Sequence, residues 1–130
     1  MTTTVEVVSF GYDHQEQPEA DIVIDARRLF RNPHRDPQMR HRTGLDRTVY
    51  DHVMATPGVT ALIRHTVASA LDLAAATGGP VVVGCGCVGG RHRSVAMARA
   101  IAAEVTMLGI GMGVAVKLHH RDVDKPVIQR

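Results

Sequence analysis

The chain has 130 residues, a length that suits one domain with a hydrophobic core of its own. Only two Phe, two Tyr and no Trp are present, so aliphatic side chains must build that core. A formal charge of +2 does not by itself indicate a nucleic-acid partner. No apolar run reaches the length of a membrane span, and the first residues lack the features of a signal peptide. We therefore expect a cytoplasmic protein with no membrane partner.

The first part of the chain predicts two short strands followed by a long loop. Val5–Phe10 and Asp21–Asp25 are rich in β-branched residues, which favour strands. The segment 26–44 contains two prolines and no clean periodicity, and a loop of this length in a small domain is usually functional. The arginines concentrated there are Arg27, Arg28, Arg31, Arg35, Arg40, Arg42 and Arg47. This clustering of arginines fits either an ordinary solvent-exposed surface or an RNA-binding surface.

The middle of the chain predicts two helices. Asp46 can cap a helix that runs through Tyr50 and Val53. Thr56 followed by Pro57 predicts the start of a second helix, because proline is favoured in the first helical turn. Apolar residues then recur at helical spacing until the glycines at 78 and 79.

The second half predicts a buried strand, a glycine loop, a helix and a last strand. Val81–Val83 suits a strand that is covered on both faces. Gly89 and Gly90 permit a tight loop after it, and Ser94 can cap the helix that follows. We expect the last strand at 111–118.

Strands that alternate with helices predict an α/β fold, a three-layer sandwich around a small, mainly parallel sheet. Ligands of such sheets bind beyond the carboxyl ends of the strands. Polar segments follow three predicted strands directly, at 25–36, 87–94 and 119–122. We expect these segments to meet at one edge, within a single domain that spans residues 1–130.

The segment Cys87–Ser94 predicts an anion site. Free N–H groups at a helix start, with Arg91, His92 and Arg93 beside them, would surround a bound anion. Phosphate matches best, because a guanidinium group donates two parallel hydrogen bonds. The spacing of Cys87 and Arg93 is also that of cysteine-dependent phosphatases, in which a thiolate attacks phosphorus. An anion-binding loop and a phosphatase loop both remain open.

Other chemistries receive no support from the sequence. The loop lacks the Gly-Lys-Ser/Thr ending of nucleotide-binding P-loops. Cys85 and Cys87 are too close in sequence for a good disulfide geometry, and His119 and His120 are neighbours without metal-ligand spacing. We predict no cofactor, no metal and two reduced thiols.

The segment Asn32–Pro37 combines turn-forming residues with an imidazole and charges. It is either a surface turn or a second wall of the anion pocket, with Arg27, His34 and Arg40 as donors. An RNA-binding surface would use Arg35, Arg40, Arg42 and Arg47. Because few aromatic side chains are available for base stacking, such RNA contacts would be mostly to phosphates and would weaken steeply with salt.

Six short motifs occur in a fixed order along nearly the whole chain. They are Ser9–Tyr12, Ala20–Arg27, Asn32–Pro37, Thr43–Asp46, Gly86–Val95 and His120–Asp122. Together they resemble the C-terminal domain of the RapZ family of RNase adapter proteins, over about Val5 to Lys125.

The resemblance implies a binding domain rather than an enzyme. In the family this domain binds glucosamine-6-phosphate, and enterobacterial members bind small RNAs and present them to an endoribonuclease. Family members also assemble into homo-oligomers. The residues that the resemblance places in the ligand site are Cys87, Val88, Gly89, Gly90, Arg91, His92, Arg93, Ser94, Arg27, Asn32, His34, His120 and Arg121.

The chain departs from the family in three respects. The usual family chain carries an N-terminal nucleotide-binding domain with a P-loop, which this sequence lacks, so ATP or GTP binding is not expected. The tail after Asp122 is less basic than in RNA-binding relatives, and Val88 stands where Thr is common. We expect a stand-alone domain that senses a phosphorylated amino sugar and regulates a protein or RNA partner. The alternatives are an RNA-binding adapter and a phosphatase that uses Cys87 and Arg93.

Overall fold

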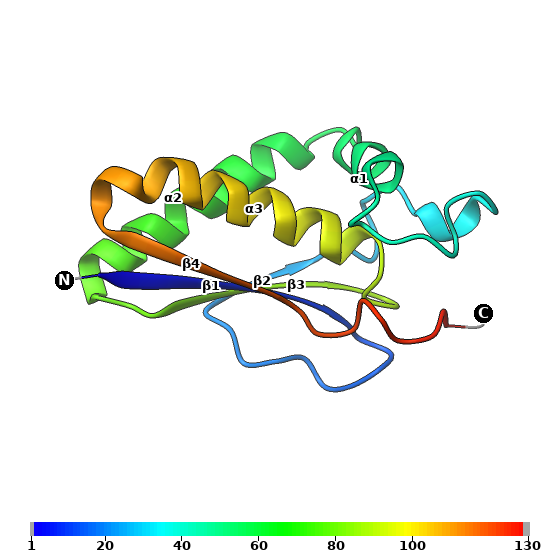
Figure 1. The fold of residues 1–130 in the computed structure, drawn as a ribbon, viewed down its shortest axis with the longest axis horizontal. Coiled ribbons are helices and arrows are strands. Elements are labelled where there is room, and N and C mark those ends of the chain that lie inside the picture. Colours follow the sequence, from blue (N-terminus) through cyan, green and yellow to red (C-terminus); the bar gives the residue numbers. More distant parts are fainter. Residues whose placement is uncertain (1, 129–130) are drawn as a thin grey trace.

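A computed structural model describes residues 2–128 (Figure 1). Its elements are β1 (Thr3–Gly11), β2 (Ile22–Asp25), the 3-10 helix η1 (Pro33–Arg35), α1 (Arg47–Met54), α2 (Val59–Thr77), β3 (Val81–Cys87), α3 (Arg93–Gly109), the 3-10 helix η2 (Ile110–Met112) and β4 (Val114–His120). The strands form one sheet in the order β2-β3-β1-β4, and every pair is parallel. The predicted α/β fold with a parallel sheet is confirmed.

The helices pack on one face of the sheet, as Figure 1 shows. Val5 and Val7 of β1 and Val81 and Val83 of β3 are buried against them, which accounts for the β-branched strand sequences. The helical side chains buried in this core include Ile63, Val67, Ala70, Met97, Ile101 and Val105. By length and composition alone, α2 and the segment 93–112 could cross a membrane, and in this fold they form the helical layer over the sheet.

The second face of the sheet is covered by the segment 12–21, which runs beneath it in Figure 1. Phe10 is fully buried there, and its ring meets the Tyr12 ring edge-on at 4.9 Å. A Cβ atom at Gly86 would lie 2.6 Å from the Phe10 ring, so glycine is required at this position. The segment 12–21, whose Tyr12 packs on Phe10 of β1, therefore occupies the side where a third layer of the sandwich is expected.

One of the three predicted helix caps is confirmed: the Asp46 Oδ1 accepts a hydrogen bond from Thr48 N at 2.8 Å. The predicted starts of α2, α3 and β4 differ from those in the structure. The Thr56 cap is wrong: α2 begins after Gly58, whose φ is 88°, and the Thr56 hydroxyl accepts instead from Arg31 N.

The predicted Ser94 cap is also wrong, because α3 begins one residue earlier, at Arg93. Ser94 is fully buried in the first turn, and the Cys87 thiol donates to its hydroxyl at 3.2 Å. The last strand begins at Val114 rather than at 111, because Gly111 lies in η2 and Gly113 turns the chain with a φ of 69°.

Candidate ligand-binding site

The carboxyl ends of the four parallel strands meet at one edge, as the sequence predicts. Ala26 N donates to Gly86 O, which joins the end of β2 to the end of β3. Gly11 N at the end of β1 donates to the Asp122 carboxylate at 2.7 Å, just after β4. The three segments that carry the polar motifs therefore lie together.

Arg93 ties the loop between β3 and α3, residues 88–92, to the segment after β2. Its side chain is only 3% exposed, and Nη1 donates to the carbonyl oxygens of Ala26 and Arg27 at 3.2 and 2.8 Å. Because a buried guanidinium needs acceptors for its donors, these carbonyls fix where the long loop begins. In this structure the Arg93 side chain positions the backbone.

Arg91 connects the same loop to both of its neighbours. Its Nη1 donates to the carbonyl oxygens of Val123 and Lys125, and its Nη2 donates to that of His41 at 2.8 Å. Arg91 therefore holds the C-terminal segment 123–128 and the segment 32–41 on either side of the loop.

His92 adds a second link to the segment 32–41. Its Nε2 donates to Arg40 O at 3.0 Å, and burial lowers the pKa of the imidazole to about 4. The ring is therefore neutral at pH 7 and does not contribute the positive charge that the sequence suggests.

Gly90 lets the loop pass close to β1. Its φ is 73°, and a Cβ there would lie 2.6 Å from Gly11 N and 2.9 Å from the Asp122 Cβ. Asp122 is fully buried and accepts hydrogen bonds from Gly11 N, Arg121 and Lys125. Although burial alone would raise the pKa of this carboxyl, those three donors lower it to about 2.

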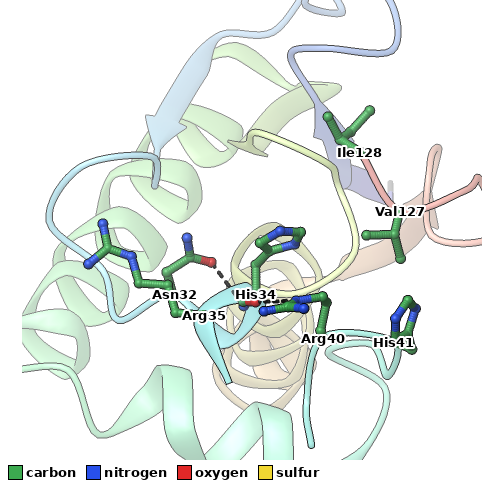
Figure 2. A pocket seen from close by; sticks show the side chains of 7 residues that line it. All are labelled: Asn32, His34, Arg35, Arg40, His41, Val127 and Ile128. Atoms are coloured by element: carbon green, nitrogen blue, oxygen red, sulfur yellow. Dashed lines mark hydrogen bonds between the residues drawn. The ribbon is translucent and has the colours of Figure 1, made fainter. Parts of the chain in front are cut away.

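A cleft of about 630 Å³ opens beside this framework (Figure 2). Its lining residues are Asn32, His34, Arg35, Arg40, His41, Val127 and Ile128.

Two hydrogen bonds shape the polar wall of this cleft. Asn32 Oδ1 accepts from His34 N at 3.1 Å, and Arg40 Nε donates to His34 O at 2.8 Å. Figure 2 shows the His34 ring turned toward the β3–α3 loop, and Arg35 extends away from it. The wall thus combines an amide, two imidazoles and two guanidinium groups.

The C-terminal segment supplies the apolar wall of the cleft. Val127 and Ile128 line it, and a Cβ atom at Gly89 would lie 3.6 Å from Ile128 Cγ1. The segment therefore lies directly over the glycine loop. Cationic and amide donors opposite two aliphatic side chains suit a small anion that also has an apolar face.

Asn32 and His34 of the expected ligand site line the cleft, and so does Arg40, which the sequence offers both as a pocket donor and as an RNA-binding residue. Arg35, which the sequence assigns to RNA, lines it too. The loop residues Gly89, Gly90, Arg91, His92 and Arg93 form the framework behind it.

Cys87, Val88 and Ser94 are not among the lining residues of the cleft. Cys87 is 3% exposed and belongs to the hydrophobic core, and Val88 O accepts from Asp13 N.

Three other expected residues lie apart from the cleft. Arg27 forms an ion pair with Asp25 at 2.7 Å and stacks on the Tyr12 ring. His120 Nδ1 shares a hydrogen bond with the buried Ser9 hydroxyl at 2.7 Å. Arg121 donates to the Asp122 carboxylate and to the Glu16 carbonyl, so its role here is to anchor the turn after β4.

Sequence reasoning missed His41, Val127 and Ile128. The adjacent apolar pair Val127-Ile128 in an otherwise polar tail is the signal that could have found the second wall. No sequence pattern indicates His41. It lies beside the C-terminal segment because Arg91 donates hydrogen bonds to the carbonyl oxygens of both His41 and Lys125.

The RNA-binding prediction concerns a surface that is largely exposed. Arg28, Arg31 and Arg35 are exposed and form no ion pair among residues 2–128. Arg42 and Arg47 are also exposed, but each pairs with the aspartate four residues later, at 3.7 and 3.5 Å.

Both cysteines, Cys85 and Cys87, are free and buried. Within residues 2–128, no group of three or more His, Cys, Asp or Glu side chains is arranged to hold a metal ion.

The structure is an all-parallel α/β domain with a polar cleft at the carboxyl edge of its sheet. A family model described as the RapZ C-terminal domain matches residues 3–124, so the chain belongs to this family.

Similar proteins match nearly the whole length of this chain. A protein of Trichlorobacter lovleyi is 38% identical over 126 residues, which cover 94% of this chain and 42% of that protein. One from Thermus thermophilus is 40% identical and one from Rhodospirillum centenum is 41% identical, over 93% of this chain and 43% and 36% of theirs. All three are named nucleotide-binding proteins. The chain thus spans about two fifths of the length of these relatives.

Proposed function

We propose that this domain binds a phosphorylated amino sugar, of the glucosamine-6-phosphate type, in the cleft beside the β3–α3 loop. The observation that carries the proposal is the composition of the cleft walls. Arg35, Arg40 and the two imidazoles offer donors to a phosphate and to hydroxyl groups. Val127 and Ile128 offer an aliphatic surface to the face of a sugar ring.

A sensing role fits this arrangement better than catalysis. A cysteine phosphatase needs a thiolate that reaches the substrate phosphorus, together with an arginine that holds the phosphate oxygens. Here the Cys87 thiol is buried against Ser94, and Arg93 donates to backbone carbonyls. We therefore propose binding without turnover, with the occupied cleft recognised by a protein or RNA partner.

Calorimetric titration with glucosamine-6-phosphate tests the proposal, and phosphate release is assayed in the same samples. Glucosamine and inorganic phosphate are the controls, and ATP and GTP are added because relatives carry the name nucleotide-binding protein. Saturable binding of the sugar phosphate alone, without release, is expected. Release of phosphate would instead assign Cys87 the role of a nucleophile.

Two arginine variants test where the ligand sits. Arg35→Gln removes a donor at the cleft wall and should weaken binding about tenfold, the usual loss for one charge-assisted hydrogen bond. Arg28→Gln, at an exposed position outside the cleft, should leave affinity unchanged. Equal affinities of the two variants would remove the cleft assignment.

Two further variants distinguish a residue that holds the loop backbone in place, Arg93, from the candidate nucleophile, Cys87. Arg93→Ala should abolish binding, because it releases the backbone at Ala26 and Arg27 from the loop. Cys87→Ser should retain binding, since the thiol does not line the cleft. Loss of binding in Cys87→Ser with an unchanged melting temperature would contradict this assignment.

RNA binding is a second candidate, supported by the exposed arginines at positions 28, 31 and 35. It would rest on phosphate contacts, so affinity for a structured RNA should fall steeply as salt is raised from low to physiological concentration. The triple variant with glutamine at all three positions should lose the complex. A gel-shift titration with no complex at low salt would eliminate this candidate.

A further inference from the structure

Strand β4 forms one edge of the sheet, opposite β2. The hydrogen bonds to β1 show which backbone groups of β4 point toward the sheet and which point away from it. Thr3 N donates to Gly113 O, and Arg121 N donates to Ser9 O, so residues 113 and 121 turn their backbone groups toward β1. Backbone groups alternate along a strand. Val114, Val116 and Leu118 therefore turn their N–H and C=O groups away from the sheet, at an edge with no neighbouring strand among residues 2–128.

The side chains of Val116 and Leu118 line a groove of about 420 Å³ between β4 and α3. The other lining residues are Tyr50, Arg99, Ala102, Ala103 and Thr106. Because two of the four α3 residues that line it are alanines, the groove has room for additional side chains. Leu118 remains 42% exposed beside it.

Arg99 provides a positive charge at one end of the groove. Its guanidinium lies 4.6 Å from the centre of the Tyr50 ring, and Nη1 donates to Gly44 O at 2.7 Å. The positive charge of Arg99 helps to lower the pKa of His120, at the end of β4. At the other end of α3, Gly109 packs against Val114, at the start of β4. Arg99 therefore sits beside the His120 end of β4.

The end of α3 and η2, which precede β4 in the chain, carry exposed apolar side chains. Met107, Leu108, Ile110 and Met112 are 69%, 55%, 77% and 49% exposed, near the start of β4. An unpaired strand edge thus adjoins a groove with aliphatic walls, and exposed apolar side chains precede the strand, a combination that suits extended peptides.

We propose that this edge binds an extended segment of another protein, which adds to β4 as an antiparallel strand. Antiparallel pairing is the more stable arrangement. The partner would then run from the His120 end toward Val114. It would place an acidic side chain at Arg99 and apolar side chains in the groove two and four residues later.

The chemistry of the groove favours such a partner over a second copy of this chain. Strand β4, Val114–His120, contains no Asp or Glu, so its own copy would bring no acid to Arg99. It would instead bring Lys117, His119 and His120 to an edge that already carries these residues. Lys117 has an acidic neighbour in Glu6 at 4.0 Å, which leaves Arg99 as the cation that faces the groove.

Fluorescence anisotropy with a labelled synthetic peptide tests the proposal. The peptide starts with glutamate and continues with threonine and valine in alternation, and a peptide of reversed sequence is the control for direction. Val116→Pro removes an outward N–H without removing a hydrogen bond to β1, and Leu118→Asp places a carboxylate in the groove. If Val116→Pro prevents folding, the Leu118→Asp variant still tests whether the peptide binds at this edge.

The proposal predicts that the peptide binds the unmodified chain and that both edge variants lose binding at an unchanged fold. Arg99→Gln should bind about tenfold more weakly, whereas Arg64→Gln, on the exposed face of α2, should bind as the parent does. No binding to the parent chain, or equal binding to all variants, would overturn the proposal. Self-association that Val116→Pro abolishes, with no peptide binding, would assign the edge to a second copy and overturn it as well.

Discussion

Acidification below neutral pH should destabilise this domain through His92. The side chain is 6% exposed, and its pKa falls from 6.5 to about 4 in the folded protein because burial disfavours the charged ring. Between these two pH values the His92 ring is protonated in the unfolded chain and neutral in the folded protein. The free energy of unfolding therefore falls as the pH is lowered through this window, and it is fully retained above 6.5.

The size of the effect follows from the width of the window. A single proton changes the free energy of unfolding by about 1.4 kcal/mol per pH unit, so the interval from 6.5 to about 4 corresponds to about 3 kcal/mol. Burial also lowers the pKa of His120, which adds to the effect in the same direction. Asp122 acts only at lower pH, since its stabilisation is lost from 3.8 toward about 2.

Urea unfolding followed by far-UV circular dichroism, at a series of pH values, measures this slope. His92→Gln keeps an N–H donor for Arg40 O but does not titrate, so it should lose most of the slope between neutral pH and about pH 4. His65→Gln, on the exposed face of α2, should keep the parent slope. An unchanged slope in His92→Gln would refute the assignment of the effect to this ring.

Three further predictions concern the framework of the cleft. Asp122→Asn should lower the free energy of unfolding by about 3 kcal/mol in urea titrations, because it leaves buried donors without their charged acceptor, whereas the exposed Asp124→Asn should not. Gly90→Ala should cost about 2 kcal/mol, measured by thermal melting, because of its positive φ and the adjacent backbone, and Gly111→Ala, in open space, should cost little. Arg91→Ala should speed hydrogen exchange in residues 123–128 and weaken sugar-phosphate binding, and an unchanged exchange rate would contradict the anchoring role.

The elements that follow from short-range chemistry could be predicted from the sequence. The strands follow from runs of β-branched residues, and the Asp46 cap depends on an acceptor two residues from its donor. The glycine loop follows equally from local sequence, since a positive φ at Gly90 needs a residue without Cβ. The placement of polar segments at one edge followed from the parallel strand order alone.

The features that were wrong or missed depend on partners far away in the chain. Thr56 resembles a helix cap, but its hydroxyl is bound by the amide of Arg31, 25 residues earlier. The carbonyl acceptors of Arg93, which no sequence pattern indicates, lie 66 and 67 residues earlier in the chain, while its role as a phosphate ligand stays a prediction. The tail residues Val127 and Ile128 become a cleft wall only because Arg91 holds the preceding carbonyls. No local pattern encodes these pairings.

The choice of carbonyl partners for Arg91 has a kinetic consequence. A carboxylate would both fix a guanidinium and cancel its charge, whereas a carbonyl oxygen fixes it and leaves the net charge in place. The charge of Arg91 therefore contributes a positive potential at this edge, which acts on an approaching anion before any contact forms. The association rate of the proposed phosphorylated ligand should accordingly depend on ionic strength more strongly than its dissociation rate.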